Sequence, residues 1–351
     1  MHLNTIFKQI NRPIRTIYER FFLFKIVRDA THVLAKDLNE TFVTLLKSYK
    51  ILGRILNGTV EEFYKNRSRL WFKKFFVEKE LYELVKQDIE SLYPKYKDVK
   101  VIMTKRGVVI YDNYKKNSFN ILLMTIHSGT WIDNKLEKRM CPIKSKLLRE
   151  EDIATDKIYR NIVLEQNGIW IDNKQSRFIC DFNRDMNSAI HTSTSQQWIK
   201  KIWKEPPTEA QKKHILDSYK EFYFTLTRLL ETYRFNIIFD AHSMRNLPGR
   251  PSVSFGTRYV PLFYIPIVKK LAKKFNNLGY EKVRFNYPFK GGYILQFLST
   301  KFPDIFIFSM EINKRLYMDK TEKIIKKRKV KKLSENLLKV FKFEENALKK
   351  S

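Results

Sequence analysis

Two kinds of hydrophobic pattern divide the chain near Pro94. Before this point, apolar residues recur every three or four positions, as in the stretch 34–46, and this spacing predicts mostly helical structure for residues 1–95. After it, short apolar runs dominate, and the run 120–127 is continuous, as is typical of a strand buried on both faces. Because such runs alternate with helical patterns, the sequence predicts an α/β fold with a mixed, mainly parallel sheet.

The elements predicted after Pro94 follow this alternation. Strands are expected at 99–103, 107–112, 120–127, 168–172, 177–182, 236–242 and 304–312, and helices at 152–167, 208–233 and 267–280. The stretch from Thr321 has the pattern of one basic amphipathic helix. The chain therefore divides into a helical N-terminal extension at 1–95, a main domain at 96–320 and a C-terminal helix at 321–351.

Composition places the chain among globular proteins. Its 351 residues are 43% hydrophobic and 14% aromatic, enough to bury a sizeable core. No apolar run approaches the roughly eighteen residues of a membrane helix, and the N-terminus lacks the pattern of a secretion signal. The two cysteines, Cys141 and Cys180, are too few for a disulfide framework. We therefore expect a soluble, cytoplasmic protein without a membrane span.

The net charge is strongly positive. Lysine and arginine number 68 against 37 aspartates and glutamates, which gives +31, and such a charge attracts nucleic acid, anionic lipid or acidic metabolites. The charge is diffuse along the chain, and much of it is lysine beside asparagine and isoleucine. We therefore interpret it as compositional bias, expect no specific nucleic-acid partner, and interpret the basic run 326–332 as one face of a helix.

Two of the six histidines stand at the ends of strong apolar runs. His127 ends the run 120–127, and His242 ends the run 236–242. Open α/β sheets present their sites just beyond the carboxyl ends of their strands, so both imidazoles can reach one crevice. A single histidine in such a place is more often structural, but a matched pair makes a metal site as plausible as the structural interpretation.

A catalytic zinc site needs a third protein ligand, often a carboxylate, and leaves a fourth position open. The spacing of two ligands three residues apart is absent, because Thr130 follows His127 at that distance. The acidic run EEDIATD offers Glu150, Glu151, Asp152 and Asp156 at a helix start, where carboxylates also stabilise the helix dipole.

Other residues suit proton transfer and anion binding. Glu311 ends the last strand at the same sheet edge, where partial burial raises a carboxyl pKa and suits it to act as a general base. An exposed charge at a strand end is the competing interpretation. Arg184 can bind a carboxylate in bidentate fashion with Asn183 as a further donor, although Arg184 can instead pair with Asp181 or Asp185.

Six segments occur in a recognisable order. They are HSG (127–129), DIATD (152–156), DFNR (181–184), DAHSM (240–244), NYPFKGGY (286–293) and MEINKRLYM (310–318). Together they resemble the N-formylglutamate amidohydrolase family over roughly residues 118–318. The resemblance implies a phosphorylase/hydrolase-like three-layer sandwich with a zinc centre, related in plan to zinc carboxypeptidases and amidases.

Carried over residue by residue, the resemblance implies particular roles in catalysis. It makes His127, His242 and Asp152 the Zn²⁺ ligands, with Asp152 preferred to Asp156, and it makes Glu311 the general base. The reaction it implies is hydrolysis of the amide bond of a small N-acyl amino acid, with N-formyl-L-glutamate as the default substrate.

The resemblance also implies a way of holding this substrate. Asn183 and Arg184 would bind its α-carboxylate, and a second carboxylate would need a further cation. The candidates for this are Arg245, Arg250 and Lys290, beside Gly291 and Gly292, which let backbone approach a ligand closely.

Two departures from the family pattern leave alternatives open. Ile126 stands where the family commonly has proline, and about ninety N-terminal residues have no recognised counterpart. An added region can cover the site or recruit a macromolecular substrate. The alternatives are therefore cleavage of a larger peptide or cell-wall amide, and a non-catalytic basic module that binds nucleic acid or a membrane surface.

Overall fold

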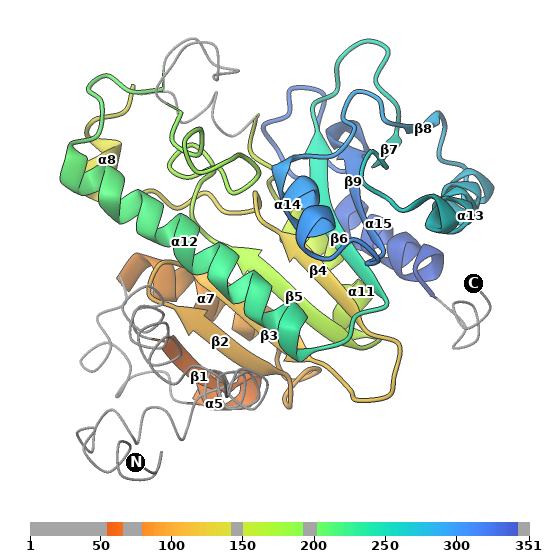
Figure 1. Ribbon diagram of the computed structural model, residues 1–351, viewed down its shortest axis with the longest axis horizontal. Helices are drawn as coiled ribbons and strands as arrows, with labels where there is room; N and C mark the ends of the chain where they lie inside the picture. The colour runs from red at the N-terminus through yellow and green to blue at the C-terminus, as the bar shows by residue number, and fades with distance from the viewer. Residues whose placement is uncertain (1–54, 66–78, 142–149, 192–201, 343–351) are drawn as a thin grey trace.

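The computed structural model describes residues 55–65, 79–141, 150–191 and 202–342 (Figure 1). One sheet of nine strands runs through this part of the chain, in the order β1-β2-β3-β5-β4-β6-β9-β7-β8. The strands are β1 (Ile55–Thr59), β2 (Lys100–Thr104), β3 (Val108–Asn113), β4 (Ile121–Thr125), β5 (Gly168–Asn173), β6 (Ile237–Met244), β7 (Val253–Gly256), β8 (Val283–Phe285) and β9 (Ile307–Asn313).

The centre of the sheet is parallel and its flanks are largely antiparallel. β5, β4, β6 and β9 run parallel to one another. On one side β3, β2 and β1 continue the sheet in antiparallel pairs, and on the other β7 pairs antiparallel with β9. The predicted mixed α/β sheet is confirmed. Because the carboxyl ends of parallel strands meet at one edge, residues at the ends of β4, β6 and β9 come together there.

Helices cover both faces of the sheet. They are α5 (Val60–Lys65), α7 (Lys79–Leu92), α8 (Asn134–Glu137), α10 (Thr155–Tyr159), α11 (Asn161–Leu164), α12 (Glu209–Thr232), α13 (Ile265–Asn277), α14 (Tyr293–Lys301) and α15 (Lys327–Val340), with short 3₁₀ turns η2 (Leu262–Tyr264) and η3 (Lys314–Leu316). α12 begins as predicted, because Thr208 and Gln211 form a capping box at its first turn.

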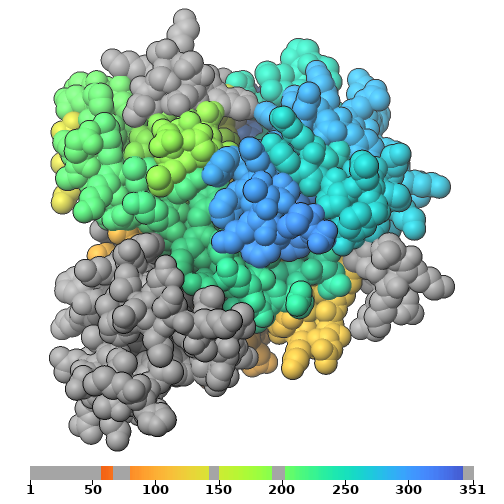
Figure 2. Space-filling view, viewed as in Figure 1, coloured from red at the N-terminus to blue at the C-terminus, as the bar shows by residue number. Residues whose placement is uncertain are grey.

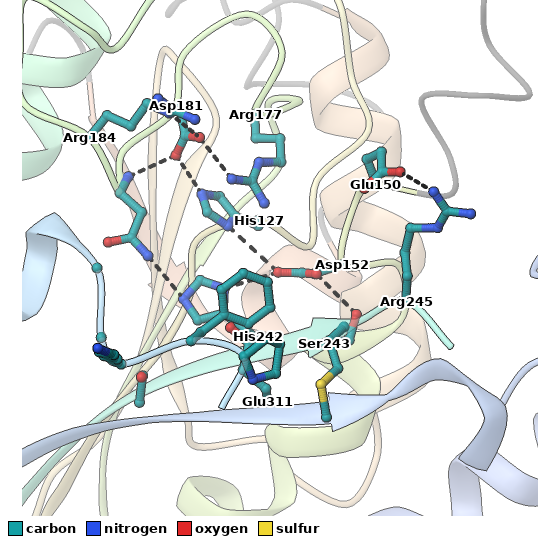
Figure 3. Close-up of a pocket in the computed structure, with 18 of the residues that line it drawn as sticks. His127, Glu150, Asp152, Arg177, Asp181, Arg184, His242, Ser243, Arg245 and Glu311 are labelled. Atoms are coloured by element: carbon teal, nitrogen blue, oxygen red, sulfur yellow. Dashed lines mark hydrogen bonds and ion pairs between the residues drawn. The ribbon is translucent and has the colours of Figure 1, made fainter. Parts of the chain in front are cut away.

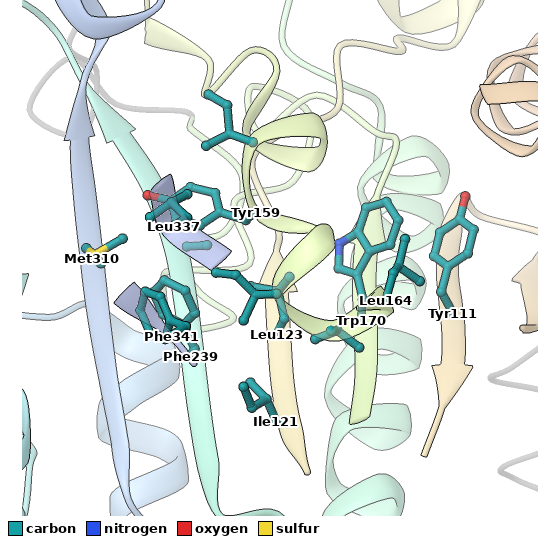
Figure 4. Close-up of a cluster of buried hydrophobic side chains, with 14 of the residues drawn as sticks. Tyr111, Ile121, Leu123, Tyr159, Leu164, Trp170, Phe239, Met310, Leu337 and Phe341 are labelled. Atoms are coloured by element: carbon teal, nitrogen blue, oxygen red, sulfur yellow. The ribbon is translucent and has the colours of Figure 1, made fainter. Parts of the chain in front are cut away.

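The hydrophobic core lies in two layers, one on each face of the sheet. On one face, α7, α10, α11, α13 and α15 pack against strand residues such as Leu123 and Phe239 (Figure 4). The Phe239 ring stacks on Phe341, which follows α15, with ring centroids 4.9 Å apart. On the other face α12 and α14 pack against Leu122 and Ile171, and Figure 2 shows this side of the molecule. The expected three-layer sandwich is confirmed.

The described part of the N-terminal region belongs to this same core. β1 lies within the range 1–95 that the hydrophobic pattern assigned mostly to helices, and it pairs with β2 along its whole length. α5 and α7 bury their apolar faces in the core that the central strands share. This region therefore widens the sheet. The helical positions expected at 34–46 lie outside the described residues.

Two predicted elements differ from the structure. Residues 177–182, expected as a strand, form turns, in which Arg177 reaches Asp181 with Nη2 2.8 Å from a carboxylate oxygen. The helix expected at 152–167 is instead the short pair α10 and α11. It starts late because Ala154 has a left-handed backbone with φ of 65°, which a helix cannot include.

The C-terminal helix lies within the expected range 321–351. α15 buries Leu333, Leu337 and Val340 and exposes most of its lysines, as its amphipathic pattern predicts. In the part of the chain that the structure describes, no helix combines the length and the apolar character needed to cross a membrane.

Candidate active site

A polar cavity of about 490 Å³ opens at the carboxyl ends of the central strands (Figure 3). His127 follows β4, His242 lies late in β6 and Glu311 lies late in β9, and all three line the cavity. β6 and β9 pair so that His242 stands directly beside Glu311. The sheet topology therefore brings together residues that are far apart in the sequence, as the strand-end argument predicted.

His127, His242 and Asp152 converge at the floor of this cavity. One nitrogen of each histidine and one oxygen of Asp152 all lie within 4.8 Å of one another. Oδ2 of Asp152 is 2.9 Å from Nδ1 of His242 and 3.6 Å from Nδ1 of His127. Asp156 lies in a different cluster, with Asp88 and Asp172. Of the acidic residues in the run EEDIATD, Asp152 is thus the one beside the histidines.

Asp152 is held from several directions. Its Oδ1 accepts a hydrogen bond from the Ser243 hydroxyl at 3.0 Å, and its backbone N–H donates to the carbonyl oxygen of His127 at 3.2 Å. Burial alone would raise its pKa, but the two imidazoles outweigh burial and hold the pKa below its usual range. Asp152 is therefore an ionised, fixed carboxylate, as a metal ligand must be.

Both histidines have a carboxylate at the ring nitrogen that faces away from Asp152. Nε2 of His127 lies 2.8 Å from Asp181, and Nε2 of His242 lies 2.7 Å from Asp240. Asp181 and Asp240 are fully buried. A carboxylate at Nε2 would keep the proton there when a metal ion is bound, so that the lone pair of Nδ1 could face the ion, which is the usual arrangement behind a histidine ligand.

The chemistry of these groups fits a divalent metal ion. Nδ1 of His127 is buried and has no hydrogen-bond partner among the described residues, and a buried polar atom without a partner is rare in proteins. Two imidazole nitrogens and one carboxylate oxygen that face a common point form the donor set of a catalytic zinc site. Figure 3 shows the three side chains directed toward one another.

Glu311 is 8% exposed and lines the same cavity. Burial raises the pKa of its carboxyl to about 8, against the opposing effect of His242. The structure thus places Glu311 in a buried setting beside the histidines, and the alternative of an exposed strand-end charge is wrong.

Arg184 and Asn183 come from the loop that carries Asp181. Nε of Arg184 lies 3.4 Å from Asp181, so the pairing considered from sequence is present. Asp181 also contacts Arg177, so that one buried carboxylate serves two guanidinium groups. Asn183 lies between the histidines and α14, because Nδ2 is 3.3 Å from Nε2 of His242 and Oδ1 accepts from the backbone N–H of Ile294.

Two motif glycines have no room for a side chain. A Cβ on Gly129 would lie 2.2 Å from the carbonyl carbon of Lys174, and a Cβ on Gly292 would lie 2.2 Å from Oδ1 of Asn183. Gly292 and its neighbour Gly291 line the cavity beside Lys290. The KGGY segment therefore packs against Asn183 and forms one wall of the cavity.

Arg245 lines the cavity but is already paired. Its guanidinium lies 2.7 Å from Glu150 and 3.3 Å from Glu322. These two carboxylates neutralise it, so the structure does not support Arg245 as the cation for a substrate carboxylate. It fixes the loop after β6 to the residues before Asp152.

Three residues that surround His127, His242 and Asp152 were not predicted from the sequence. Asp240 could have been found, because it lies two residues before His242 and side chains two apart in a strand share a face. Asp181 sits in a loop, where no periodicity indicates direction. Lys314 is buried and donates from Nζ to the carbonyl oxygen of Glu151 at 2.7 Å, next to Asp152. Because a lysine is rarely buried, nothing in the sequence indicates that Lys314 lies inside the protein.

The three-layer fold, with two histidines and a carboxylate beyond the ends of its parallel strands, has the phosphorylase/hydrolase-like plan that the sequence predicted. The model of the N-formylglutamate amidohydrolase family matches residues 119–318, more than half of the chain. The chain belongs to this family of amidohydrolases, as the order of its six segments predicted.

A solved structure agrees with the fold. An N-formylglutamate amidohydrolase from Ralstonia eutropha aligns with 67% of this chain and 96% of its own, at 17% identity and a TM-score of 0.56. A protein from Agrobacterium tumefaciens aligns with 67% of this chain and 94% of its own, at 16% identity and a TM-score of 0.49. A comparison with curated protein sequences finds no significant match.

Proposed function

We propose that this chain is a zinc-dependent amidohydrolase that cleaves the amide bond of an N-acyl amino acid, with N-formyl-L-glutamate as the default substrate. The observation that carries the proposal is the convergence of His127, His242 and Asp152 in the cavity. Family membership supports the amidohydrolase reaction. The buried Nδ1 of His127, which has no hydrogen-bond partner among the described residues, supports the metal.

In this proposal, His127, His242 and Asp152 would hold a Zn²⁺ ion, which would supply polarisation of the acyl oxygen and of the attacking water. Glu311 takes a proton from that water while the oxygen of the water forms the new bond to the acyl carbon. The C–N bond then breaks, and Glu311 returns the proton to the leaving nitrogen. With N-formyl-L-glutamate the products are formate and glutamate.

The rest of the cavity would hold the substrate in register. Arg184 binds the α-carboxylate, and Nδ2 of Asn183 is a further donor. Binding of an anion here is favoured because two guanidinium groups, those of Arg177 and Arg184, share the single carboxylate of Asp181. Lys290 binds the side-chain carboxylate, and Gly291 and Gly292 allow the substrate to lie close to the backbone. In the proposal, a substrate held in this way would have its formyl carbon beside Glu311.

The test is release of formate from N-formyl-L-glutamate by the full-length protein. His242→Ala removes a ligand and should abolish turnover, whereas His214→Ala removes an exposed histidine on α12 and should leave it intact. Equal turnover by both variants would contradict the proposed site. Absence of formate release by the parent protein, with nucleic acid or vesicle binding present, would favour the non-catalytic alternative.

A further inference from the structure

Lysine and arginine outnumber aspartate and glutamate among the residues that line the cavity. Seven lysine and arginine residues line it against four aspartate and glutamate residues. Arg177 is paired with Asp181, and Arg245 is paired with Glu150. The excess positive charge therefore does not lie on Arg177 or Arg245.

Three cations form what we call the basic rim: Arg250, Arg258 and Lys290. Among the described residues, no carboxylate lies within ion-pair distance of any of them. The undescribed segments that adjoin cavity residues in sequence, 142–149 and 192–201, contain no aspartate or glutamate. The positive charge of the basic rim thus has no acidic counterpart in the described cavity wall.

Backbone hydrogen bonds and a ring contact hold the residues of the basic rim in place. The N–H of Arg258 donates to the carbonyl oxygen of Lys290 at 3.0 Å, so the two side chains start from bonded segments. The Arg250 guanidinium lies over the ring of Phe289, 5.5 Å from its centroid. The carbonyl oxygen of Arg250 accepts from Arg315 at 3.2 Å, which fixes the backbone of this residue. Cations held in this way lose less freedom on binding an anion than isolated surface lysines do.

The basic rim continues from the place proposed for the α-carboxylate. Lys290 leads through Gly291 to Gly292, which packs against Asn183. A substrate anchored by Arg184 and Asn183 through its α-carboxylate therefore directs its side chain along Lys290 toward Arg258 and Arg250. A single side-chain carboxylate would occupy only one of these three cations.

We infer that the substrate is an N-acyl amino acid whose side chain ends in two or more carboxylates, bound by Arg250, Arg258 and Lys290. An N-acyl glutamate extended through its side-chain carboxyl by a second glutamate has this chemistry, because its α-carboxylate stays free. This inference rests on the proposed function for the position of the acyl group. It extends that function from a single amino acid to a side-chain-linked acidic dipeptide.

The test uses three probes with no, one and two distal carboxylates: N-formyl-L-glutamine, N-formyl-L-glutamate and N-formyl-γ-L-glutamyl-L-glutamate. The parent protein should show kcat/KM that rises along the series, by about tenfold or more at the last step, because a hydrogen bond to a charged group contributes this much. Arg258→Gln and Arg250→Gln should each reduce the last step. Lys269→Gln, which removes an exposed lysine of α13 outside the cavity, is the control for net charge and should keep it.

Binding of the same probes to Glu311→Gln by calorimetry separates this inference from the proposed function. Affinity that follows the number of distal carboxylates and depends on Arg258 supports the basic rim even if the parent hydrolyses none of the probes. Hydrolysis of N-formylglutamate without preference for the dipeptide, in kcat/KM and in affinity, overturns the inference and leaves the proposed function standing.

Discussion

At the residue scale, the proposed reaction depends most on Glu311. The carboxyl is buried beside His242 and lines the cavity. Glu311→Gln keeps the shape of the side chain and removes the proton acceptor. We expect kcat on N-formyl-L-glutamate to fall by roughly 10²–10⁴-fold, because general-base assistance is of this size, while the zinc content stays at the parent value. Unchanged turnover would remove Glu311 from the reaction.

The pKa of the same carboxyl predicts the acidic limb of the pH profile. Burial raises the pKa of Glu311 from 4.5 to about 8, and a bound cation moves it back down because it favours the charged form. A general base acts when ionised, so kcat/KM should rise with pH through this pKa and then level off. The midpoint should lie between 4.5 and 8. A profile that falls with rising pH across this interval would contradict the assignment.

Asp181 tests whether the carboxylates behind the histidines support the metal. Asp181→Asn removes the negative charge 2.8 Å from Nε2 of His127. We expect zinc affinity, measured by competition with a chelator, to fall by about 10–100-fold, as is usual for such partners. Asp185→Asn changes a carboxylate in the same loop and should keep the parent affinity. Thermal melting checks that both variants fold, and equal affinities would contradict the role of Asp181.

At the element scale, the hydrophobic periodicity predicted the strands and helices whose side chains are buried in a regular pattern. The continuous apolar runs became the buried strands β4, β6 and β9, and the capping residue Thr208 marked the start of α12. The pattern failed where backbone conformation or ion pairs decide, as at Ala154 and in the loop 177–182. It also failed for β1, because a short edge strand beside a helix has too few residues to show a period.

Ion pairs connect α7 to the end of β5, and the hydrophobic periodicity does not reveal them. Nζ of Lys174 contacts Asp88 of α7 and Asp172 of β5, and all three side chains are buried. Burial lowers the pKa of Lys174, but Asp172 and Asp88 outweigh burial and raise it well above its usual range. Asp172 accepts in turn from Ser128, next to His127. The N-terminal elements are therefore connected to the site.

Lys174→Met should be strongly destabilising. It leaves the carboxylates of Asp88 and Asp172 buried without their cation, and the free energy of unfolding should fall by about 3–5 kcal/mol, measured by urea denaturation. Lys86→Met removes the partly exposed Lys86–Glu83 pair of α7, with its 3.1 Å contact, and should cost less than about 1 kcal/mol. Similar costs for the two variants would contradict a structural role for the buried cluster.

At the scale of the whole molecule, the order of segments predicted more of the site than any local pattern did. His127, His242 and Asp152 are separated by up to 115 positions in the sequence, and the parallel centre of the sheet, together with the loop that carries Asp152, brings them within 4.8 Å. The spacing of the proposed ligands carries no metal motif, so Asp152 was predicted as the third of them from the family resemblance. The partners Asp181 and Lys314 depend on loop conformations, which no periodicity describes.

The most direct test of the central claim is the metal content of the full-length protein purified without chelator. We expect close to one zinc per chain, and we expect this zinc to be lost in His242→Ala but not in His214→Ala. Chelation should abolish the hydrolysis of N-formyl-L-glutamate, and restored zinc should recover it. A metal-free protein that hydrolyses N-formyl-L-glutamate at the full parent rate would contradict the central claim.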